Sequence, residues 1–304
     1  LKVLTVDAAP FTFHTLLMHV ITDERCLAYS QPGHPERPQR VAGTLALLRA
    51  QQEIKISWEK PEPPKDDKPI ARAHDLAHIH NVSHPPGMFD GDTPDYPDID
   101  AHARRSIGGA LRALELARAD KPNFSLLRPP GHHATRDRAM GFCYLNSIAT
   151  AVLAARATGV RKVAVFDFDV HHGNGTEAIL HKQEGCAFFS IHQHPAYPGT
   201  GTKSFDNIQN YTVPPDSLNE DWRKIANKTL ADLKNYKPDL IAVSAGYDAY
   251  KRDPLCQQKL EIADFEWIAR QLRQLKTPLM SILEGGYSND LPKLILAYLK
   301  GLLK

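Results

Sequence analysis

The sequence predicts an α/β fold with a central, mainly parallel sheet and helices on both faces. Two observations support this prediction. Short runs rich in β-branched and aromatic residues alternate with helical patterns from residue 18 to the end of the chain, which is the order that βαβ units produce. The strand-like runs are almost continuously apolar, as expected where helices cover both faces of a sheet. No repeat or change in composition marks a second domain, so we expect a single domain.

The elements follow in order along the chain. Residues 1–17 contain mixed aromatics without a clear period and receive no assignment. The predicted strands are FSLL (124–127), VAVFDFDV (163–170), AFFSI (187–191), LIAVS (240–244) and LMSIL (279–283). The predicted helices span about 38–50, 102–119, 145–158, 219–235, 258–275 and 290–303. Two Pro- and Asp-rich stretches interrupt this order: 59–69 is expected to be a solvated connector, and 84–100 is a long loop of the functional or disordered kind.

Composition excludes several classes of partner and location. The formal net charge is only +2, so nothing indicates a surface for nucleic acid or for an anionic membrane. No run approaches the roughly 18–20 apolar residues of a membrane span. The four cysteines lack CxxC spacing, which is typical of a reducing compartment. Without a recognisable secretory signal we expect a cytoplasmic protein, although the first residue is not Met and an earlier leader stays open.

Polar, reactive residues follow each predicted strand at its carboxyl end. These segments are PPGHH (129–133), DFDVHHGN (167–174), HQH (192–194), AGYDA (245–249) and EGGY (284–287). Ligands gather outside the carboxyl ends of strands in open parallel sheets. Strands that deliver His, Asp, Glu or Tyr to one edge therefore indicate an active site.

The segment VFDFDVHHGNGT (165–176) places two aspartates in the most strand-like part of the chain. Aspartate is a poor strand former and is costly to bury unpaired. In an extended strand Asp167, Asp169 and His171 project to the same side, and a cation there would offset the cost of burial. A catalytic zinc takes three such ligands, for which Asp169 and His171 supply two and Asp248 is the best candidate for the third. Asp167 is better placed to accept a hydrogen bond from a group beside the metal, or to bind another ion.

Simpler structural roles compete with these interpretations. A lone Asp248 at a strand end is commonly a helix N-cap, and a lone His192 or His194 is commonly a satisfied, partly buried histidine. For the adjacent histidines 132 and 133, taken without their context, a structural role and a catalytic role both remain open. The run DFDVHH (167–172) is different, because two acids and two imidazoles side by side have few purely structural uses.

Taken together, these residues resemble the histone deacetylase superfamily, which shares the arginase-like three-layer fold. The matching segments, in the family's order, are HPERPQR (34–40), IGGA (107–110), RPPGHHA (128–134), GFCYLN (141–146), DFDVHHGNGT (167–176), YPGTG (197–201), SAGYDAYKRDPL (244–255) and LEGGYS (283–288). Asn174, AGYDA and LEGGY are more similar to class II and bacterial histone deacetylase-like amidohydrolases than to class I. The resemblance implies a single catalytic domain over 1–304, with 1–17 outside the match.

The resemblance implies roles for particular residues. The metal ligands would be Asp169, His171 and Asp248, holding Zn²⁺ or Fe²⁺. His133 would be general base and later acid, with His132 as its electrostatic partner, and Tyr287 would donate a hydrogen bond to the substrate carbonyl. Asp167 would orient His132, and Asn174 would stand behind His133. Since asparagine is neutral, we expect it to stabilise the imidazolium form less than a carboxylate would, which keeps His133 available as a base.

The same resemblance implies a substrate channel and a structural cation. Phe142 and Tyr197 would form the walls of a narrow acyl channel beside Gly141 and Leu255, and Asp92 would match the rim aspartate that holds the substrate backbone. A structural K⁺ would be bound by Asp167, Asp169, His171, Ser190 and Ile191.

The leading hypothesis is a zinc-dependent deacylase of acyl-lysine or of an acylated small amine. Leu255 is apolar where an acidic residue would favour a polyamine, whereas Asp92, Asp95 and Asp98 could attract a cation. Two alternatives from other classes are a binuclear arginase-type hydrolase and an acyl-lysine binding module without turnover. In the binuclear scheme, 132–133 and Tyr287 have no obvious task. We expect no nucleic-acid or membrane partner, and an oligomer is possible.

Overall fold

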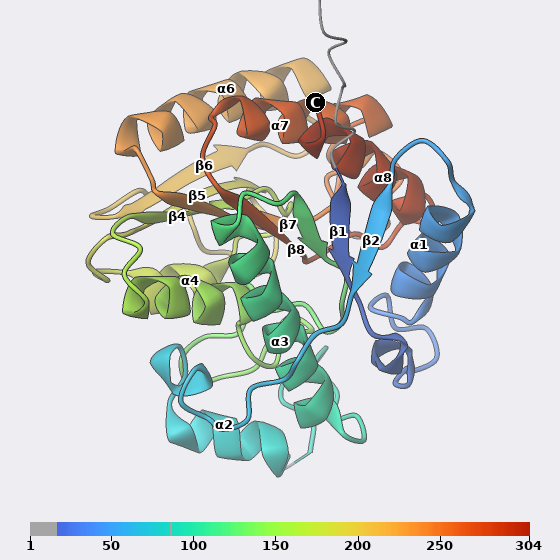
Figure 1. The fold of residues 1–304 in the computed structure, drawn as a ribbon, viewed down its shortest axis with the longest axis vertical. Helices are drawn as coiled ribbons and strands as arrows, with labels where there is room; N and C mark the ends of the chain where they lie inside the picture. The colour runs from blue at the N-terminus through green and yellow to red at the C-terminus, as the bar shows by residue number, and fades with distance from the viewer. Residues whose placement is uncertain (1–16, 86) are drawn as a thin grey trace, which may run out of the picture.

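The computed structural model describes residues 17–85 and 87–304, so most of the unassigned segment 1–17 lies outside it. These residues form an eight-stranded sheet in which all neighbours are parallel, in the order β2-β1-β3-β8-β7-β4-β5-β6 (Figure 1). The strands are β1 (Met18–Ile21), β2 (Ile56–Glu59), β3 (Asn123–Ser125), β4 (Val163–Asp167), β5 (Cys186–Gln193), β6 (Ile208–Val213), β7 (Leu240–Ala245) and β8 (Leu279–Leu283). The predicted parallel sheet is confirmed.

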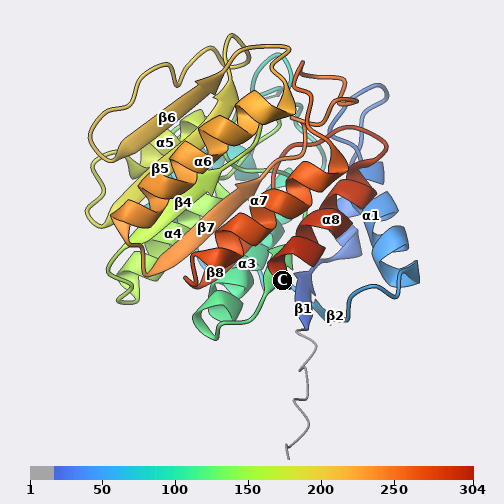
Figure 2. The same cartoon turned by 90° about the horizontal axis from the view of Figure 1, so that it is seen from above.

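Helices cover both faces of the sheet. Their bounds are α1 (Gln39–Ala50), α2 (Leu76–Ser83), α3 (Ile99–Arg118), α4 (Ser147–Ala157), α5 (Asn174–Leu180), α6 (Asn219–Tyr236), α7 (Ile262–Gln274) and α8 (Leu291–Leu302), with 3₁₀ turns η1 (Glu24–Leu27) and η2 (Ile70–Arg72). Figure 2 shows α6, α7, α8 and α1 along one face and α3, α4 and α5 behind the other. The result is the three-layer arrangement predicted from the alternation of strands and helices.

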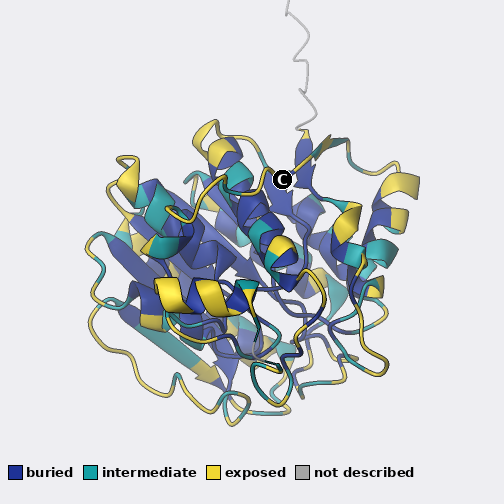
Figure 3. Ribbon diagram, turned by 90° about the horizontal axis from the view of Figure 1, so that it is seen from below, coloured by how far each residue is buried: buried dark blue, intermediate teal, exposed yellow. Residues whose placement is uncertain are grey.

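The core forms on each side of the sheet because side chains alternate along the strands. In β4, Phe166 packs into the cluster shared with α6–α8, whereas Val163 and Val165 pack into the cluster shared with α3–α5. Both faces of the central strands are buried (Figure 3), which explains their continuous apolar sequence. None of the helices in the described residues combines the length and the apolar character needed to cross a bilayer.

The structure contains elements that the sequence did not predict. Strands β2 and β6 are the two edges of the sheet and are only partly buried, so their sequences ISWE and IQNYTV lack a continuous apolar run. Strand β1 has only four residues and follows the segment without a period. Helix α5 is seven residues long and begins directly after Gly173. Helix α2 has eight residues. Short length removes the periodic signal in each case.

Several predicted boundaries differ from the structure, and two of the differences lie close to the reactive segments. The strand predicted over 163–170 ends at Asp167, so Asp169 and His171 lie on a loop and the argument from strand alternation does not apply to them. The helix predicted from residue 258 begins at Ile262, where Glu261 and Asp264 form a reciprocal capping box. Residue Leu260 instead forms a bridge with Tyr250, which keeps the chain before the helix extended.

Candidate active site

The sheet order brings the reactive segments together. Strands β8, β7 and β4 lie side by side in the centre of the sheet, with β3 and β5 flanking them. Their carboxyl ends lead into 128–133, 168–174, 245–249 and 284–287. Because all these strands run in one direction, the segments meet at one edge, as the sequence predicted.

Asp169, His171 and Asp248, which we call the ligand cluster, lie within reach of one ion. One ligand atom from each falls within 4.8 Å of the others, and all three side chains are buried. His171 Nδ1 lies 3.0 Å from Asp248 Oδ2 and 3.3 Å from Asp169 Oδ1. Two carboxylates and one imidazole are a donor set that suits zinc, and three ligands leave a position open for chemistry.

Glycines make room for the ligand cluster. A Cβ on Gly285 would stand 2.2 Å from Asp248 Oδ2, and one on Gly246 would stand 2.1 Å from Asp169 Oδ2. The backbone also fixes the carboxylates: Gly285 N donates to Asp169 Oδ2 at 2.7 Å, and Val170 N donates to Asp248 Oδ1 at 2.9 Å. Asp248 therefore does not act as a helix N-cap, and its carboxylate is held toward His171.

The ligand cluster carries an excess of negative charge. Burial and the neighbouring charge of Asp169 raise the pKa of Asp248. Burial alone would lower the pKa of His171, but its hydrogen bonds with Asp169 and Asp248 raise that pKa well above its usual range. A buried pair of carboxylates needs a compensating positive charge. A proton on His171 provides one, and a divalent cation among the same three atoms would provide a larger one.

His132 and His133, which we call the histidine pair, stand beside the ligand cluster with ring centroids 4.0 Å apart. Each is held from behind by a different partner. His132 Nδ1 lies 3.1 Å from Asp167 Oδ2, and His133 Nδ1 lies 2.8 Å from Asn174 Oδ1. The structure thus brings Asp167 and Asn174 to the places that the resemblance implied.

Burial and the surrounding charges separate the pKa values of the histidine pair. Burial would lower the pKa of His132, but the charges of Asp169 and Asp167 raise it to about 10. Burial and the charges of His132 and His171 hold the pKa of His133 well below its usual value. These shifts favour a cationic His132 beside a neutral His133. Such separation of adjacent titratable groups is a feature of acid–base sites.

Tyr287 is buried, lines a cavity together with His133 and His171, and packs against Arg40. The Arg40 guanidinium lies over the Tyr287 ring, with its carbon 4.8 Å from the centroid. Arg40 Nε donates to Gly286 O at 2.7 Å, and Arg40 also donates to Glu284 O. Burial, the largest cause, raises the pKa of Tyr287 well above its usual range. The phenol thus keeps its proton and remains a hydrogen-bond donor.

A cavity of about 220 Å³ reaches His171 of the ligand cluster. All five predicted substrate-binding residues line it together with members of the catalytic group: Asp92, His133, Gly141, Phe142, His171, Tyr197, Leu255 and Tyr287. The Phe142 ring meets Tyr287 edge-on at 5.7 Å between centroids, and Tyr197 meets His133 at 5.1 Å. Aromatic walls of this kind suit a thin apolar stem and exclude water.

The channel wall depends on an unusual backbone at 141–142. Gly141 and Phe142 both have positive φ, at +57° and +67°, and a Cβ on Gly141 would stand 2.6 Å from His133 Cδ2. Phenylalanine is unfavourable in this region. Thr93 Oγ1 accepts a hydrogen bond from Phe142 N at 3.0 Å, which ties the wall to the loop that carries Asp92. The part of the predicted 84–100 loop that carries Asp92 and Thr93 is therefore part of the channel.

Two buried acids were missed by the sequence analysis. Asp253 Oδ2 accepts hydrogen bonds from Tyr287 N at 2.6 Å and Ser288 N at 3.1 Å, and its Oδ1 accepts one from Leu255 N at 3.1 Å. Burial and the charge of Asp248 raise the pKa of Asp253 to about 7. Glu284 Oε2 accepts from the backbone N–H of Gly131 at 2.7 Å, and burial raises its pKa to about 7. The only sequence signal for these two acids was their place within the short segments DPL (253–255) and LEGGY (283–287).

His192 and two of the residues predicted to bind K⁺, Ser190 and Ile191, lie on β5 and do not line the cavity. His192 lies 2.9 Å from Ser190 Oγ and 3.0 Å from Gly201 O, which fits its structural interpretation. Asp167 and Ser190 are partners in the β4–β5 register, and Ile191 follows on the same strand. The structural K⁺ site at these residues stays a prediction.

Comparison with known proteins places this geometry in context. A family model described as the histone deacetylase domain matches residues 34–302. A probable deacetylase of Methanothermobacter thermautotrophicus is 38% identical over 90% of this chain and 87% of its own length. A histone deacetylase-like amidohydrolase of Pseudomonas aeruginosa is 33% identical over 84% of this chain and 73% of its own. The crystal structure of an acetylpolyamine aminohydrolase from Burkholderia pseudomallei superimposes with a TM-score of 0.85 at 25% identity, covering 93% of this chain and 98% of that one.

Proposed function

Because this chain belongs to the histone deacetylase family of amidohydrolases, we propose that it hydrolyses the amide of an N-acylated lysine or a related aliphatic amine. The supporting observation is the floor of the channel, where His171 of the ligand cluster and His133 of the histidine pair line one cavity together with Tyr287. An amide carbonyl entering the channel would meet a cation site, a neutral base and a hydrogen-bond donor together. These are the groups that amide hydrolysis requires.

The chemistry divides among named atoms. Bound by the ligand cluster, Zn²⁺, or Fe²⁺ in its place, would act as a Lewis acid and make a water molecule more acidic. His133 Nε2 accepts the proton released as water oxygen bonds to the carbonyl carbon. Tyr287 donates its O–H to the carbonyl oxygen as negative charge grows there. When the C–N bond breaks, His133 returns the proton to nitrogen, and the products are a carboxylic acid, which keeps the second proton of the water, and an amine.

His132 has an electrostatic task in this scheme. The charges of Asp169 and Asp167 raise its pKa and so favour the cationic form. A cationic His132 would stabilise negative charge near the carbonyl and would lower the pKa of His133 beside it. His133 is then neutral before reaction, as a base must be. Asp167 and Asn174 hold the two rings in their places.

The substrate class is drawn from the channel. Its width and aromatic walls suit an aliphatic stem, and Leu255 puts an apolar group at the mouth. These features favour acyl-lysine. Acetylpolyamines are the second candidate, because Asp92 lines the same channel and the similar structure from Burkholderia pseudomallei is described as an acetylpolyamine aminohydrolase. Steady-state kinetics on an acetyl-lysine peptide and on N-acetylputrescine separate the two.

The test of the proposed function is turnover by metal-quantified protein. We expect activity with one Zn²⁺ or Fe²⁺ per chain, its loss with a hydroxamate chelator, and its return when metal is restored. Two transition ions per active chain would instead favour a binuclear arginase-type hydrolase.

Tyr287→Phe distinguishes an enzyme from a binding module. Loss of one oxyanion donor should lower kcat by roughly 10²–10³-fold, while the affinity for a non-hydrolysed acyl-lysine analogue changes little. Equal losses in turnover and in affinity would contradict the role given to the phenol.

Further parts of the proposal concern the setting of the reaction. We propose one catalytic domain across 1–304, a structural K⁺ near β4 and β5, and a reducing, cytoplasmic location. The four cysteines are all free in the structure, which agrees with such a location. The small net charge supports a substrate that is neither nucleic acid nor a membrane surface.

A further inference from the structure

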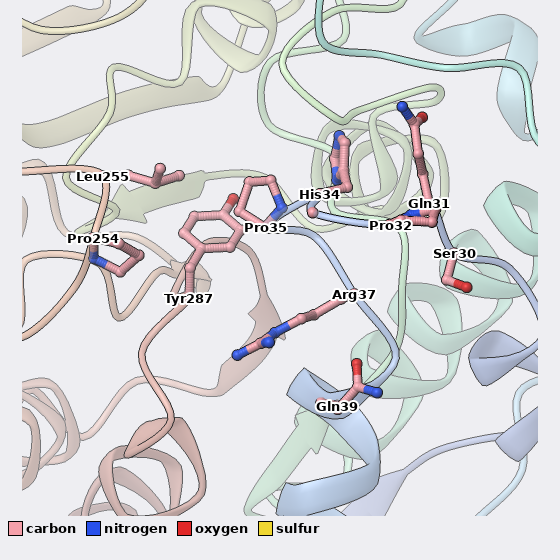
Figure 4. A pocket seen from close by; sticks show the side chains of 11 residues that line it. Ser30, Gln31, Pro32, His34, Pro35, Arg37, Gln39, Pro254, Leu255 and Tyr287 are labelled. Atoms are coloured by element: carbon pink, nitrogen blue, oxygen red, sulfur yellow. The ribbon is translucent and has the colours of Figure 1, made fainter.

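A second, wider cavity opens beside the acyl channel. It has a volume of about 700 Å³, against about 220 Å³ for the channel. Its walls come from the segment 30–39, which precedes α1, and from Pro254, Leu255 and Tyr287 (Figure 4). Leu255 and Tyr287 line both cavities. A substrate whose amide lies at the floor and whose aliphatic stem fills the channel therefore has the far end of that stem next to this second cavity, which we call the side cavity.

The side cavity carries a positive charge. Arg37 is the one permanently charged side chain among the residues that line it, and the rest of the lining includes Ser30, Gln31 and Gln39. Figure 4 shows Arg37 reaching from the 30–39 segment toward the chain that carries Tyr287. Arg37 Nη2 donates to Asn289 Oδ1 at 2.7 Å. Within the described chain no carboxylate lies at ion-pair distance from it, so its charge is not offset by a partner.

An acid stands on the channel side of the same mouth. Asp92 lines the channel, and its backbone oxygen lies 3.1 Å from Nε2 of His34, which lines the side cavity. The entrance thus presents a carboxylate on one side and a guanidinium on the other. Arginine binds carboxylates through paired N–H donors with defined geometry, whereas a second cation on a polyamine would be repelled by Arg37.

We propose that the side cavity is a subsite for a carboxylate on the amine side of the substrate, bound by Arg37; the proposal rests on the proposed deacylase function. Two substrates offer this chemistry. One is Nε-acyl-lysine with its own free α-carboxylate, and the other is a peptide with an acidic residue next to the acyl-lysine. Both place a carboxylate a few bonds beyond the end of the aliphatic stem.

The experiment compares matched substrates that differ only in charge. Values of kcat/KM are measured for Nε-acetyl-lysine and for its α-carboxamide, and in a second arm for peptides with Asp or Asn next to acetyl-lysine. We expect the native protein to prefer the carboxylate in at least one arm by about tenfold, which corresponds to roughly 1.4 kcal/mol. The arm that shows the preference identifies the source of the carboxylate.

Variants locate the preference. Arg37→Gln should bring the ratio of the two kcat/KM values close to one. Arg37→Lys keeps the positive charge but lacks the paired N–H donors of the guanidinium, so it should give an intermediate ratio. Arg138→Gln is the matched control: Arg138 is exposed and its charge acts on Tyr197, in the channel wall. It removes the same charge outside the side cavity and should leave the ratio intact.

The possible failures are distinguishable. A native ratio near one in both arms, or a preference that survives Arg37→Gln, would refute the subsite while turnover itself continued. Equal loss in Arg37→Gln and Arg138→Gln would assign the preference to general electrostatics and also refute it. Absence of turnover on all four substrates by the metal-loaded protein would refute the deacylase proposal itself.

Discussion

The floor and the rim of the channel are built in different ways. The floor consists of buried side chains at the ends of central strands, each fixed by backbone hydrogen bonds or by a partner behind it. The rim consists of loops from distant parts of the sequence, such as 30–39, the Asp92 loop and 254–255, and several of its residues are partly exposed. Preorganised groups act on the reacting bond, whereas adaptable loops select the substrate. Substitutions in the floor should therefore change kcat, and substitutions in the rim should change the ratio between substrates.

The largest effect is expected for Asp248→Asn in the floor. The substitution removes one carboxylate from a cluster of three ligands, so metal content should fall and activity should fall on the order of 10³-fold or more, from the loss of several kcal/mol of transition-state stabilisation. Metal analysis and kcat measure the two effects. Asp290→Asn, outside both cavities, is the control. Full metal content with full activity would show that Asp248 is not a ligand.

Asp253→Asn should have a smaller effect than Asp248→Asn. Asp253 connects the floor with the rim, because it binds the backbone of Tyr287 and of Leu255. Asparagine presents N–H groups where a carboxylate now accepts from the backbone of Tyr287, Ser288 and Leu255. We expect kcat to fall roughly 10–100-fold, as for other residues that orient a catalytic group.

A double-substitution cycle identifies how Asp253 acts. If its effect passes through the phenol, Asp253→Asn should change kcat little once Tyr287→Phe is present. Full additivity of the two losses, with native thermal stability in each variant, would contradict a positioning role.

Leu255→Glu changes the rim alone. A carboxylate at the mouth should improve kcat/KM for N-acetylputrescine relative to an acetyl-lysine peptide by about tenfold, the effect of one favourable charge interaction. Leu255→Gln has the same length without the charge and should leave the ratio nearly unchanged. A shift of equal size in both variants would exclude charge as the cause.

The smallest change is expected in the pH dependence of Asn174→Asp. A carboxylate 2.8 Å from His133 Nδ1 would favour the imidazolium and raise the pKa of His133. Because His133 must be neutral to act as base, the acidic limb of kcat/KM should move to higher pH, and activity should fall first on the acidic side. The measurement is the pH–rate profile of both proteins. An unmoved acidic limb would contradict the role assigned to Asn174.

The floor was largely predictable from short motifs, and the rim was not. DFDVHH, PPGHH and AGYDA each place several reactive groups within a few residues, so sequence spacing alone indicated the ligand cluster and the histidine pair. The strand-alternation argument for Asp169 and His171 was nevertheless wrong, because β4 ends at Asp167 and a loop turns both side chains toward Asp248.

The missed features depend on contacts between distant residues. Asp253 binds the backbone at 287–288, and Arg40 binds the carbonyl groups at 284 and 286. A single acid or arginine has no local sequence pattern that predicts a hydrogen bond with a backbone group so far away in the sequence. Edge strands β2 and β6 were missed for a related reason: half-buried strands lose the continuous apolar run that marked the central ones.

The position of Gly285 has a consequence for the order of events during biosynthesis. Its N–H secures Asp169 across a sequence separation of 116 residues, and the strand that leads to it, β8, fits between β3 and β7. A nascent chain emerges from the ribosome with Asp169, His171 and Asp248 long before β8 can insert. A cation site that depends on the position of Asp169 is therefore complete only after translation has passed Gly285.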